Sequence, residues 1–281
     1  NGCAYILTVD VGNTFIRFGL FAEDSAAAQE CPLATCEITT PSSITADEAR
    51  MRLAQVMGAL SADAGMPGAL VPAAAVLSCV VPALERPWKA ALSRTCTGRV
   101  LTVGPGLKTG MPVHYDDPAE IGPDRIADAV AARAVYGSPC IVIDLGTTTN
   151  IEVIDARGTF VGGVIAPGLA LGARSLSAAA ARLPQVEPSA PTHVIGRNTR
   201  EAMRSGVVLG EVARIDGMLD MVLAEMRATK AAGEGSVPIV ITGDDAEALA
   251  ALVGHSLTVD DALTLRGLAE LYRINQKPRR A

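Results

Sequence analysis

The sequence predicts a duplicated α/β fold, because one short pattern occurs near the start of each half of the chain. The pattern is an apolar run, an Asp-x-Gly-x-Thr segment and a second apolar run; it occurs at Asp10–Thr14 and again at Asp144–Thr148. In both halves, apolar runs and helix-like segments then alternate. Hairpin strands followed by alternating strands and helices, repeated twice, are typical of two similar α/β domains.

The repeated segment has the residue types that a phosphate-binding turn needs. Its glycine lets the backbone approach a phosphate closely, and its hydroxyls and turn amides are hydrogen-bond donors. The aspartate at the strand end can hold a hard cation directly or through water. A single Asp-x-Gly-x-Thr also forms an ordinary β-turn. Two of them, one in each half, predict a phosphotransferase with a nucleotide cleft between its two halves.

In the first half we expect a hairpin over 4–22, a strand at 34–39, a helix over 46–61, a strand at 74–81, a helix over 84–95 and a strand at 99–103. The apolar residues of the first helix, among them Leu53 and Val56, keep a helical period, and either Thr45 or Ser43 can cap it. Proline and glycine residues from Pro105 onward then indicate a loop-rich connection.

In the second half we expect a helix over 124–136, strands within 140–166, helices at 169–182, 199–229 and 244–252, and a strand at 237–242. Each half then contains one strand–turn–strand unit. We place the boundary so that an N-terminal domain spans 1–118 and a C-terminal domain spans 119–281. A chain of 281 residues is long enough for two such cores.

The composition excludes several classes of protein. Hydrophobic residues make up 49% of the chain, which excludes a disordered protein, and the net charge of −6 argues against nucleic acid as a partner. The basic run Lys277–Arg280 is interpreted as a solvated tail. Prolines interrupt the longest uncharged stretch, 64–84, so we expect no membrane span. Six cysteines without a C-x-x-C pair indicate reduced thiols, and we expect the cytoplasm as the compartment.

A second local signal is the segment Glu120–Arg125, at the start of the helix expected from Asp124. Proline and aspartate are common at helix starts, so capping alone accounts for Pro123 and Asp124. Arg125 is different, because a cation is disfavoured at a helix N-terminus. A cation there needs a partner, for instance a substrate carboxylate, which arginine binds through two hydrogen bonds.

Taken together, the motifs of this chain resemble those of the type III pantothenate kinases, a family of the actin-like, sugar-kinase-like ATPase superfamily. The matching segments run in order along nearly the whole chain: Asp10–Thr14, Gly19–Phe21, Ser78–Pro82, Tyr115–Pro118, Gly122–Arg125, Asp144–Thr147, Gly162–Gly168, Leu183–Pro184, Ile195–Thr199 and Leu263–Leu268. Each motif alone is weak, but the ordered set is specific.

The resemblance implies two ribonuclease H-like domains and ATP-dependent phosphorylation of pantothenate to 4′-phosphopantothenate, the first step of coenzyme A biosynthesis. It also implies a monovalent cation (K⁺ or NH₄⁺) besides Mg²⁺. Members of the family form homodimers in which the substrate site lies close to the dimer interface. We therefore expect ATP, pantothenate and a second copy of the chain as partners.

The resemblance also implies a role for individual residues. Asp124 would be the proton acceptor, and Asp144 would hold the monovalent cation. Asp10 would anchor Mg²⁺ through water, because Mg²⁺ keeps much of its hydration shell. The ATP-binding residues would be Asp10, Val11, Gly12, Asn13, Thr14, Phe15, Ile16, Arg17 and Thr147. The pantothenate-binding residues would be Tyr115, Gly122, Pro123, Asp124, Arg125 and Thr199.

Three departures from the family pattern stand out. Asp128 replaces an asparagine or apolar residue, which we interpret as a surface change. Thr148 and Glu152 are conservative replacements in the second hairpin. Asp244 stands where the family has the second glycine of Thr-Gly-Gly. It either hinders adenosine binding or caps the helix that starts there.

Two other functions remain open on the sequence. A catalytically silent family member acting as a regulatory or accessory binding protein would bind ATP without turnover, and Asp244 and Asp245 favour it. A sugar or acyl kinase of the same superfamily is the second alternative. The segment Gly122–Arg125 and Thr199 fit the pantothenate pattern better.

Overall fold

The computed structural model describes residues 4–23, 30–66 and 70–276. Packing divides them into two compact units. The first unit contains the described residues up to Val135 and those from Ala262 onward, and the second unit contains Tyr136–Asp261. The predicted solvated tail, Lys277–Arg280, lies outside the described residues.

The first unit is built on a sheet of five strands in the order β3-β2-β1-β4-β5. The strands are β1 (Tyr5–Val11), β2 (Phe15–Ala22), β3 (Ala34–Thr39), β4 (Ala74–Cys79) and β5 (Val100–Thr102). Strand β2 is antiparallel to both of its neighbours, β1 and β3, while β4 is parallel to both β1 and β5. The carboxyl ends of β1, β4 and β5 therefore lie along one edge of this sheet, where ligands bind in α/β proteins.

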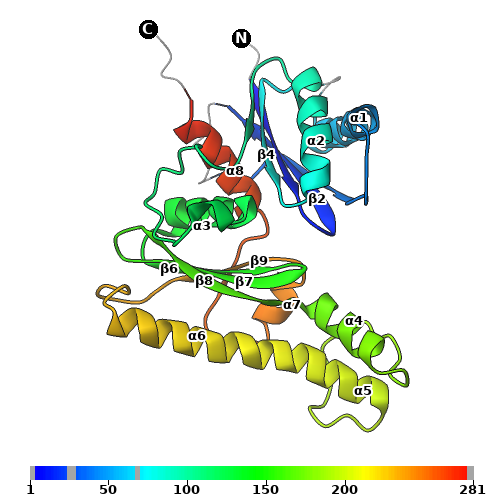
Figure 1. Ribbon diagram of the computed structural model, residues 1–281, viewed down its shortest axis with the longest axis vertical. Coiled ribbons are helices and arrows are strands. Elements are labelled where there is room, and N and C mark those ends of the chain that lie inside the picture. The colour runs from blue at the N-terminus through cyan, green and yellow to red at the C-terminus, as the bar shows by residue number, and fades with distance from the viewer. Residues whose placement is uncertain (1–3, 24–29, 67–69, 277–281) are drawn as a thin grey trace. The chain divides into compact units, whose positions relative to one another are not determined.

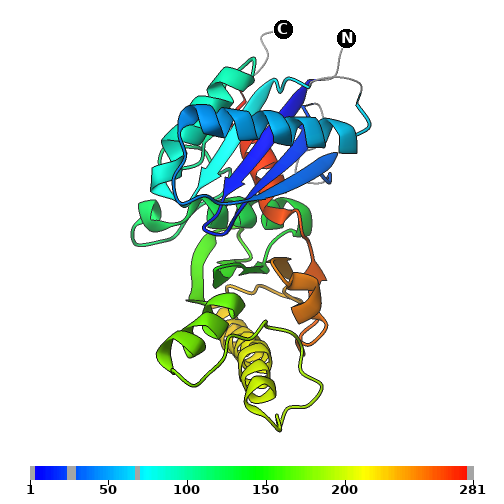
Figure 2. The ribbon, with the colours of Figure 1, turned by 90° about the vertical axis from the view of Figure 1, so that its right-hand side faces the viewer.

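Helices cover both faces of this sheet (Figures 1 and 2). The first unit has α1 (Ala46–Asp63), α2 (Pro82–Thr95), the 3-10 turn η1 (Pro118–Glu120), α3 (Pro123–Tyr136) and α8 (Leu263–Ile274). On one face, α1 and α2 enclose a core in which the rings of Phe18 and Trp88 lie 5.6 Å apart. On the other face, Phe21 of β2 packs against Leu265 and Ala269 of α8.

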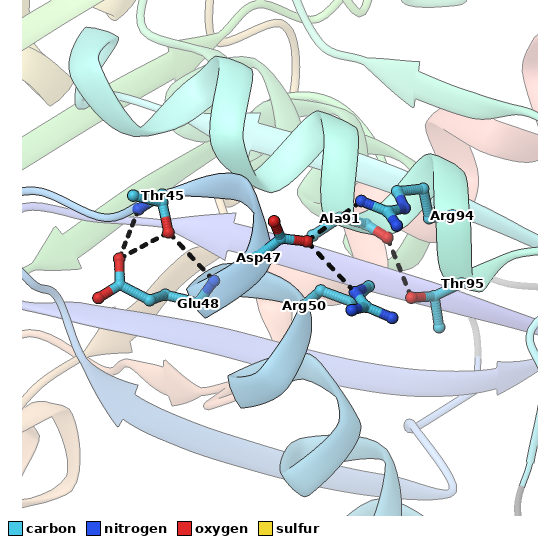
Figure 3. A network of polar contacts seen from close by, with 7 residues as sticks. All are labelled: Thr45, Asp47, Glu48, Arg50, Ala91, Arg94 and Thr95. Atoms are coloured by element: carbon cyan, nitrogen blue, oxygen red, sulfur yellow. Dashed lines mark hydrogen bonds and ion pairs between the residues drawn. The ribbon is translucent and has the colours of Figure 1, made fainter.

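The start of α1 shows how local sequence sets an element boundary (Figure 3). The hydroxyl of Thr45 accepts a hydrogen bond from the Glu48 backbone N–H at 3.2 Å, and the Glu48 carboxylate accepts from the Thr45 backbone N–H at 2.8 Å. This reciprocal pair is a capping box. Of the two candidate caps, Thr45 is the one used. Arg94 of α2 also donates to Asp47 at 3.2 Å, which links α2 to α1.

The sequence patterns did not predict α8 as a helix, and this helix changes the division of the chain. It returns to the first unit and packs closely against α3, because a Cβ at Gly267 would overlap the backbone of Ala127. The observed units therefore differ from the predicted domains 1–118 and 119–281. Both α3 and α8 belong to the first unit, because their buried faces pack there.

The second unit repeats the strand order of the first, in the order β10-β9-β6-β7-β8. Its strands are β6 (Cys140–Leu145), β7 (Thr148–Ile154), β8 (Phe160–Pro167), β9 (Ile239–Gly243) and β10 (Thr258–Val259). Its helices are α4 (Leu169–Ala179), α5 (Thr199–Arg204), the π-helix η2 (Ser205–Leu209), α6 (Gly210–Ala228) and α7 (Ala246–Ala250). Read in the reverse direction, β8-β7-β6-β9-β10, this order corresponds strand by strand to β3-β2-β1-β4-β5 of the first sheet, so the two sheets have the same topology.

The long helix α6 lies along one face of the second sheet (Figure 1). Its apolar residues Val212, Ile215 and Leu219 pack against the strand residues Ile141 and Ile143 in one core. The region predicted as one helix over 199–229 contains the π-helix η2 between α5 and α6. Such an insertion changes which side chains of the next helix face the sheet, a change that apolar spacing does not reveal.

Two further properties of the described residues bear on the class of protein. The cysteines at 31, 36, 79, 96 and 140 are all free thiols. In the portion of the chain that the structure describes, no helix is both long enough and apolar enough to cross a membrane.

Candidate active site

Asp10 lies at the carboxyl end of β1, in the middle of the first sheet. Its pairing partners are Arg17 on the antiparallel strand β2 and Ser78 on the parallel strand β4. Only 7% of the residue is exposed. The motif Ser78–Pro82 by itself indicates no role for Ser78. Its place beside Asp10 depends on strand pairing, which one-dimensional spacing does not show.

The carboxyl group of Asp10 has an unusual electrostatic environment. Burial and the charge of Asp124 raise its pKa from 3.8 to about 6, while Ser78 and the charge of Arg17 lower it. Oxygen Oδ1 is fully buried and has no hydrogen-bond partner among the described residues. A buried carboxylate oxygen without a partner is costly, and a bound cation would remove that cost. Asp10 therefore fits a magnesium ligand.

Asp124 lies in the first turn of α3, directly after Pro123, the first residue of the helix. Its Oδ1 accepts a hydrogen bond from the Arg125 backbone N–H at 2.8 Å. Burial raises the pKa of Asp124, and it outweighs the backbone hydrogen bonds and the Arg125 charge, which lower the pKa. A position at a helix start, next to Arg125, favours the ionised form of a carboxylate. At Asp124 this effect is smaller than that of burial.

Gly122 is adjacent to the Asp124 carboxylate. A Cβ built at position 122 would overlap Asp124 Oδ1 and would lie 3.5 Å from its Cγ. The carbonyl of Gly122 also accepts the first hydrogen bond of α3, from the Ile126 N–H at 3.1 Å. The absent side chain therefore lets the carboxylate of Asp124 fold back over the start of its own helix.

Two charged residues of α3 are buried. Arg125 is 5% exposed and Asp128 is fully buried. The interpretation of Asp128 as a surface change is therefore wrong. Helical periodicity places Asp128 one turn beyond Asp124 and Arg125, on the same face of α3. The sequence motif does not reveal that this face is buried, because its burial depends on the helix that packs against it.

A pocket of about 400 Å³ adjoins the start of α3 within the first unit. Its walls come from Cys79 at the end of β4, from the 103–113 loop and from the 118–126 segment. Most of the lining side chains are apolar; they include Val103, Met111, Ile121 and Ile126. Pro123, which precedes Asp124, also lines it. Its volume suits a small organic molecule.

The remaining residues of the first hairpin form its turn and second strand. The Gly12 N–H donates to the Phe15 carbonyl at 3.0 Å and closes the turn, which exposes Asn13 and Thr14. Val11 and Ile16 are buried in the core. Arg17 is half-buried and donates to Glu37 on β3 at 3.0 Å. Tyr115, in the loop before α3, is half-buried.

The second hairpin has the same construction. Asp144 lies at the end of β6, opposite Asn150 on β7 and Thr242 on β9. The Gly146 N–H donates to the Thr148 carbonyl at 2.9 Å and closes the turn that contains Thr147. Asp144 is half-buried, and a Cβ at Gly243 would lie 2.7 Å from its Oδ1. The donors at this strand end are carboxylate and backbone oxygens, which suit a hard cation.

The turn that follows β9 corrects one interpretation. The N-cap residue of α7 is Asp245, which has a left-handed backbone with φ of 59° and makes no side-chain capping bond. Asp244 therefore does not cap this helix. Its backbone N–H instead donates to the Leu145 carbonyl at 2.6 Å, so that Asp244 lies beside the end of β6.

Thr199 is the first residue of α5 and is exposed. Asn198 caps this helix by accepting from the Glu201 N–H at 3.0 Å. Two strongly exposed apolar residues, Val194 (72% exposed) and Ile195 (83% exposed), precede it. Within the second unit, Thr199 therefore lies in an open surface region.

Comparison with known proteins identifies the family. The family model described as type III pantothenate kinase matches residues 6–221. A type III pantothenate kinase from Koribacter versatilis is 37% identical over 275 residues, which cover 96% of each chain. The chain belongs to the type III pantothenate kinase family. The family, the α/β fold and the kinase activity toward pantothenate, all predicted from sequence, are confirmed.

Solved structures support the fold. A conserved putative Baf family transcriptional activator from Campylobacter jejuni is 18% identical, with a TM-score of 0.56, and the match covers 96% of this chain and 98% of that one. A ROK hexokinase from Thermus thermophilus is 14% identical, with a TM-score of 0.51 and coverage of 97% and 100%. At these identities the likeness concerns the fold alone.

Proposed function

We propose that this kinase transfers the γ-phosphoryl group of ATP to the primary hydroxyl of pantothenate, with Asp124 as the proton acceptor. The observation that carries this assignment is the pair of carboxylates in the first unit. Asp124 is close enough to Asp10 for its charge to raise the pKa of Asp10, and burial raises the pKa of both groups. Perturbed carboxylates beside a pocket are typical of catalytic sites.

The raised pKa of Asp124 suits its proposed role. A carboxylate with an ordinary pKa is a poor acceptor for the proton of an alcohol, and burial makes it a better one. Phosphoryl transfer passes through a loose transition state, in which the acceptor oxygen is still weakly bonded to phosphorus. Asp124 therefore orients the hydroxyl first and takes its proton late. The hydrogen bond from the Arg125 N–H fixes the carboxylate for this purpose.

ATP-using kinases of this family require a divalent metal such as Mg²⁺. In this chain Asp10 is the residue that would hold it, because its buried Oδ1 lacks a protein partner. A divalent ion held there would neutralise charge on the phosphate oxygens of ATP. Around it, the turn amides of Val11–Ile16 and the Arg17 side chain would bind and orient the phosphates.

In the second unit, the turn at Gly146–Thr148 would contact ATP through Thr147. Asp144 would hold K⁺ or NH₄⁺, because carboxylate and backbone oxygens meet at the end of β6. A monovalent ion has less strict geometric demands than Mg²⁺. It would add positive charge beside the nucleotide phosphates and leave the proton transfer to Asp124.

Pantothenate would bind beside Gly122–Arg125. Its carboxylate suits the Arg125 guanidinium, and its apolar dimethyl group suits the pocket of about 400 Å³ next to Pro123. Tyr115 would close the site from the preceding loop. The exposed Thr199 would complete it only if its open surface region were covered by another molecule.

A second copy of this chain is the partner we propose for that surface, so the kinase would act as a homodimer. Its place of action would be the cytoplasm, where both substrates are available to a biosynthetic kinase. Exposed apolar side chains of the second unit, Ile165, Leu176, Val194, Ile195 and Met221, support association. Size-exclusion chromatography with light scattering would measure the mass; a monomer at micromolar concentration would contradict the dimer.

The first test is mass spectrometry of the purified protein with pantothenate, ATP and Mg²⁺, in potassium or in sodium. Potassium-dependent 4′-phosphopantothenate is the expected result, and equal rates in the two salts would remove the cation assignment. Folded protein that binds ATP but forms no product in either salt would favour the accessory binding protein. In that case, Asp244→Gly would be the first reversion to make.

A panel of acceptors then tests substrate class. Pantothenate should be phosphorylated, while glucose, N-acetylglucosamine and acetate should not, because those acceptors lack the combination of primary hydroxyl, dimethyl group and remote carboxylate. Product from a sugar or an acyl acid at a comparable rate would favour another kinase of the superfamily.

A further inference from the structure

A buried polar network lies directly beneath the second phosphate turn. The hydroxyl of Thr149, two residues after Thr147, donates to the Glu211 carboxylate at 2.6 Å. Arg214, one turn further along α6, forms an ion pair with the same carboxylate. Arg214 also donates to the Pro167 carbonyl at 2.5 Å. The network thus joins the start of α6 to the start of β7 and the end of β8.

The segment after Pro167 touches the turn itself. The Gly168 N–H donates to the Thr147 carbonyl at 3.0 Å. A Cβ at Gly168 would overlap the Gly146 carbonyl, so the two backbones are in direct contact there. Any displacement of Pro167 would therefore be transmitted to Gly146 and Thr147. Arg214 holds Pro167 through its hydrogen bond to the Pro167 carbonyl, and the ion pair with Glu211 holds Arg214 in turn.

Stability alone does not account for a charge at position 211. Glu211 is 5% exposed and Thr149 is 3% exposed. Its sequence neighbour Val212 and Ile215, one turn further along α6, belong to the apolar core. Replacing a buried ion pair by apolar residues is often neutral or stabilising, because desolvation of the charges is costly. The Glu211 carboxylate, by contrast, accepts from two donors, Thr149 and Arg214, and holds both of them in one geometry.

The backbone before Glu211 is also irregular. The π-helix Ser205–Leu209 ends two residues before it. One extra residue in a helical turn rotates every later side chain by about 100° around the axis. Insertions of this kind are frequent at functional sites. Here the insertion sets the angular position of Glu211 on α6 and so brings its carboxylate to Thr149.

We infer that Glu211 is a positioning residue for ATP, which holds the second phosphate turn in its binding geometry through Thr149 and Arg214. The inference rests on the proposed role of the Gly146–Thr148 turn in nucleotide binding. It adds residues of α6 that touch neither substrate. Loss of the Glu211 carboxylate should therefore weaken ATP binding and leave pantothenate binding unchanged.

The test compares Glu211→Gln and Thr149→Val with wild type. Both substitutions keep the side-chain shape: the first removes the charge and the second removes the hydroxyl. Calorimetry with Mg·ATP, in the absence of acceptor, should show affinity reduced by about two- to tenfold in each variant. The KM for pantothenate should stay within about twofold. The double variant should bind ATP no more weakly than the weaker single variant, because the contact that Thr149→Val removes is one of those that Glu211→Gln disturbs.

Asp216→Asn is the matched control. Asp216 lies on the same helix, and its carboxylate accepts from the Gly254 N–H at 2.9 Å and pairs with His255. Its replacement should lower the melting temperature without changing ATP affinity. Folded Glu211→Gln and Thr149→Val with wild-type ATP affinity would overturn the inference, as would a parallel loss of ATP and pantothenate binding. If Glu211→Gln fails to fold, Thr149→Val decides by the same criteria.

The binding measurement separates this inference from the proposed function. Wild-type protein that binds ATP but forms no 4′-phosphopantothenate would contradict the proposed reaction, while the comparison of variants would still decide the role of Glu211. Wild-type protein that does not bind ATP would overturn both.

Discussion

The two strand–turn–strand hairpins place their aspartates at equivalent positions but surround them with different groups. Asp10 pairs with Arg17 on the antiparallel side and Ser78 on the parallel side. Asp144 pairs with Asn150 and Thr242 in the same registers. The short hydroxyl residue on the parallel strand is retained. On the antiparallel strand, the cation Arg17 of the first hairpin corresponds to the neutral amide Asn150 of the second.

Charges reach the two hairpins from different directions. In the first, Arg17 lies opposite Asp10, and Asp124 is near enough to raise its pKa. In the second, the Glu211–Arg214 ion pair contacts the hairpin through Thr149, behind the turn. The first hairpin therefore has its charged groups beside the aspartate. The second has a charged support beneath its turn.

The difference shows that the duplicated fold repeats a position rather than a chemistry. Each sheet ends its first strand in a carboxylate beside a glycine-containing turn. Residues outside the repeat, Asp124 on α3 in one unit and Glu211 on α6 in the other, give the two hairpins different charged surroundings. We therefore expect substitutions at equivalent positions to have different effects, and four experiments test this expectation.

The largest effect should come from Asp124→Asn. The variant keeps the side-chain shape but cannot accept the proton of the substrate hydroxyl, so kcat should fall by about 10²–10⁴-fold. Steady-state kinetics measures the loss, and circular dichroism checks the fold. Glu120→Gln is the matched control, because this exposed carboxylate lies four residues earlier and should leave kcat unchanged. An active Asp124→Asn enzyme would remove Asp124 as the proton acceptor.

The next largest effect should be a change in stability in Asp10→Asn. Because the pKa of Asp10 is raised from 3.8 to about 6, protonation of Asp10 favours the folded state. That stabilisation is complete below the unfolded pKa and is lost as pH rises through about 6. Above this range wild type carries a buried charge that Asp10→Asn lacks. The variant should be more stable by about 3 kcal/mol at most.

Melting temperatures between pH 4 and 8, with a chelator present, measure this difference. The two curves should coincide near pH 4 and separate above pH 6, by several degrees. Mg²⁺ should stabilise wild type at pH 8 and leave Asp10→Asn unaffected, because only the carboxylate binds it. Parallel curves across the range would contradict the assignment of the raised pKa to Asp10.

Asp144→Asn should have a smaller effect, of about tenfold, confined to the response to potassium. At saturating Mg²⁺ the variant should lose its activation by K⁺ and keep its activity in sodium. Asp155→Asn is the control: Asp155 is a buried carboxylate of the same unit, but it caps a turn by accepting from the Arg157 and Thr159 N–H groups at 2.9 Å. Retention of potassium activation in Asp144→Asn would place the cation elsewhere.

The sequence predicted most elements of both units because their signals are local. The strand at 34–39 and the first helix were found from apolar spacing and capping. Helix α8 was missed, and with it the assignment of α3 to the first unit. Its role depends on close backbone packing of Gly267 against Ala127, a contact between residues far apart in sequence.

The candidate site shows the same limit. The residue types at Asp10, Asp124 and Asp144 were recognisable from motifs, but their electrostatics were not. Burial raises the pKa of Asp124 against the effects of its hydrogen bonds and of Arg125, and Asp128 is buried inside the protein. Capping by Asp244, one of two alternatives for that residue, rested on residue preference alone, and Asp245 with its left-handed backbone is the N-cap residue instead. Motifs predict which residues matter, while packing determines the state in which they act.

The smallest effect tests the hairpin comparison most directly. Arg17→Asn gives the first hairpin the residue type that Asn150 has in the second. Arg17 lowers the pKa of Asp10, but it is the weakest of the four influences on that group, so the variant should raise this pKa only slightly above about 6. The KM for ATP should rise by about two- to fivefold, because one cation near the phosphates is lost.

Arg17 also pairs with Glu37 at 3.0 Å, so Glu37→Gln is the control that breaks this ion pair but keeps the cation. If both variants raised the KM equally, Arg17 would act through β3 rather than on phosphate, and the chemical difference between the hairpins would then reside in Asp124 alone.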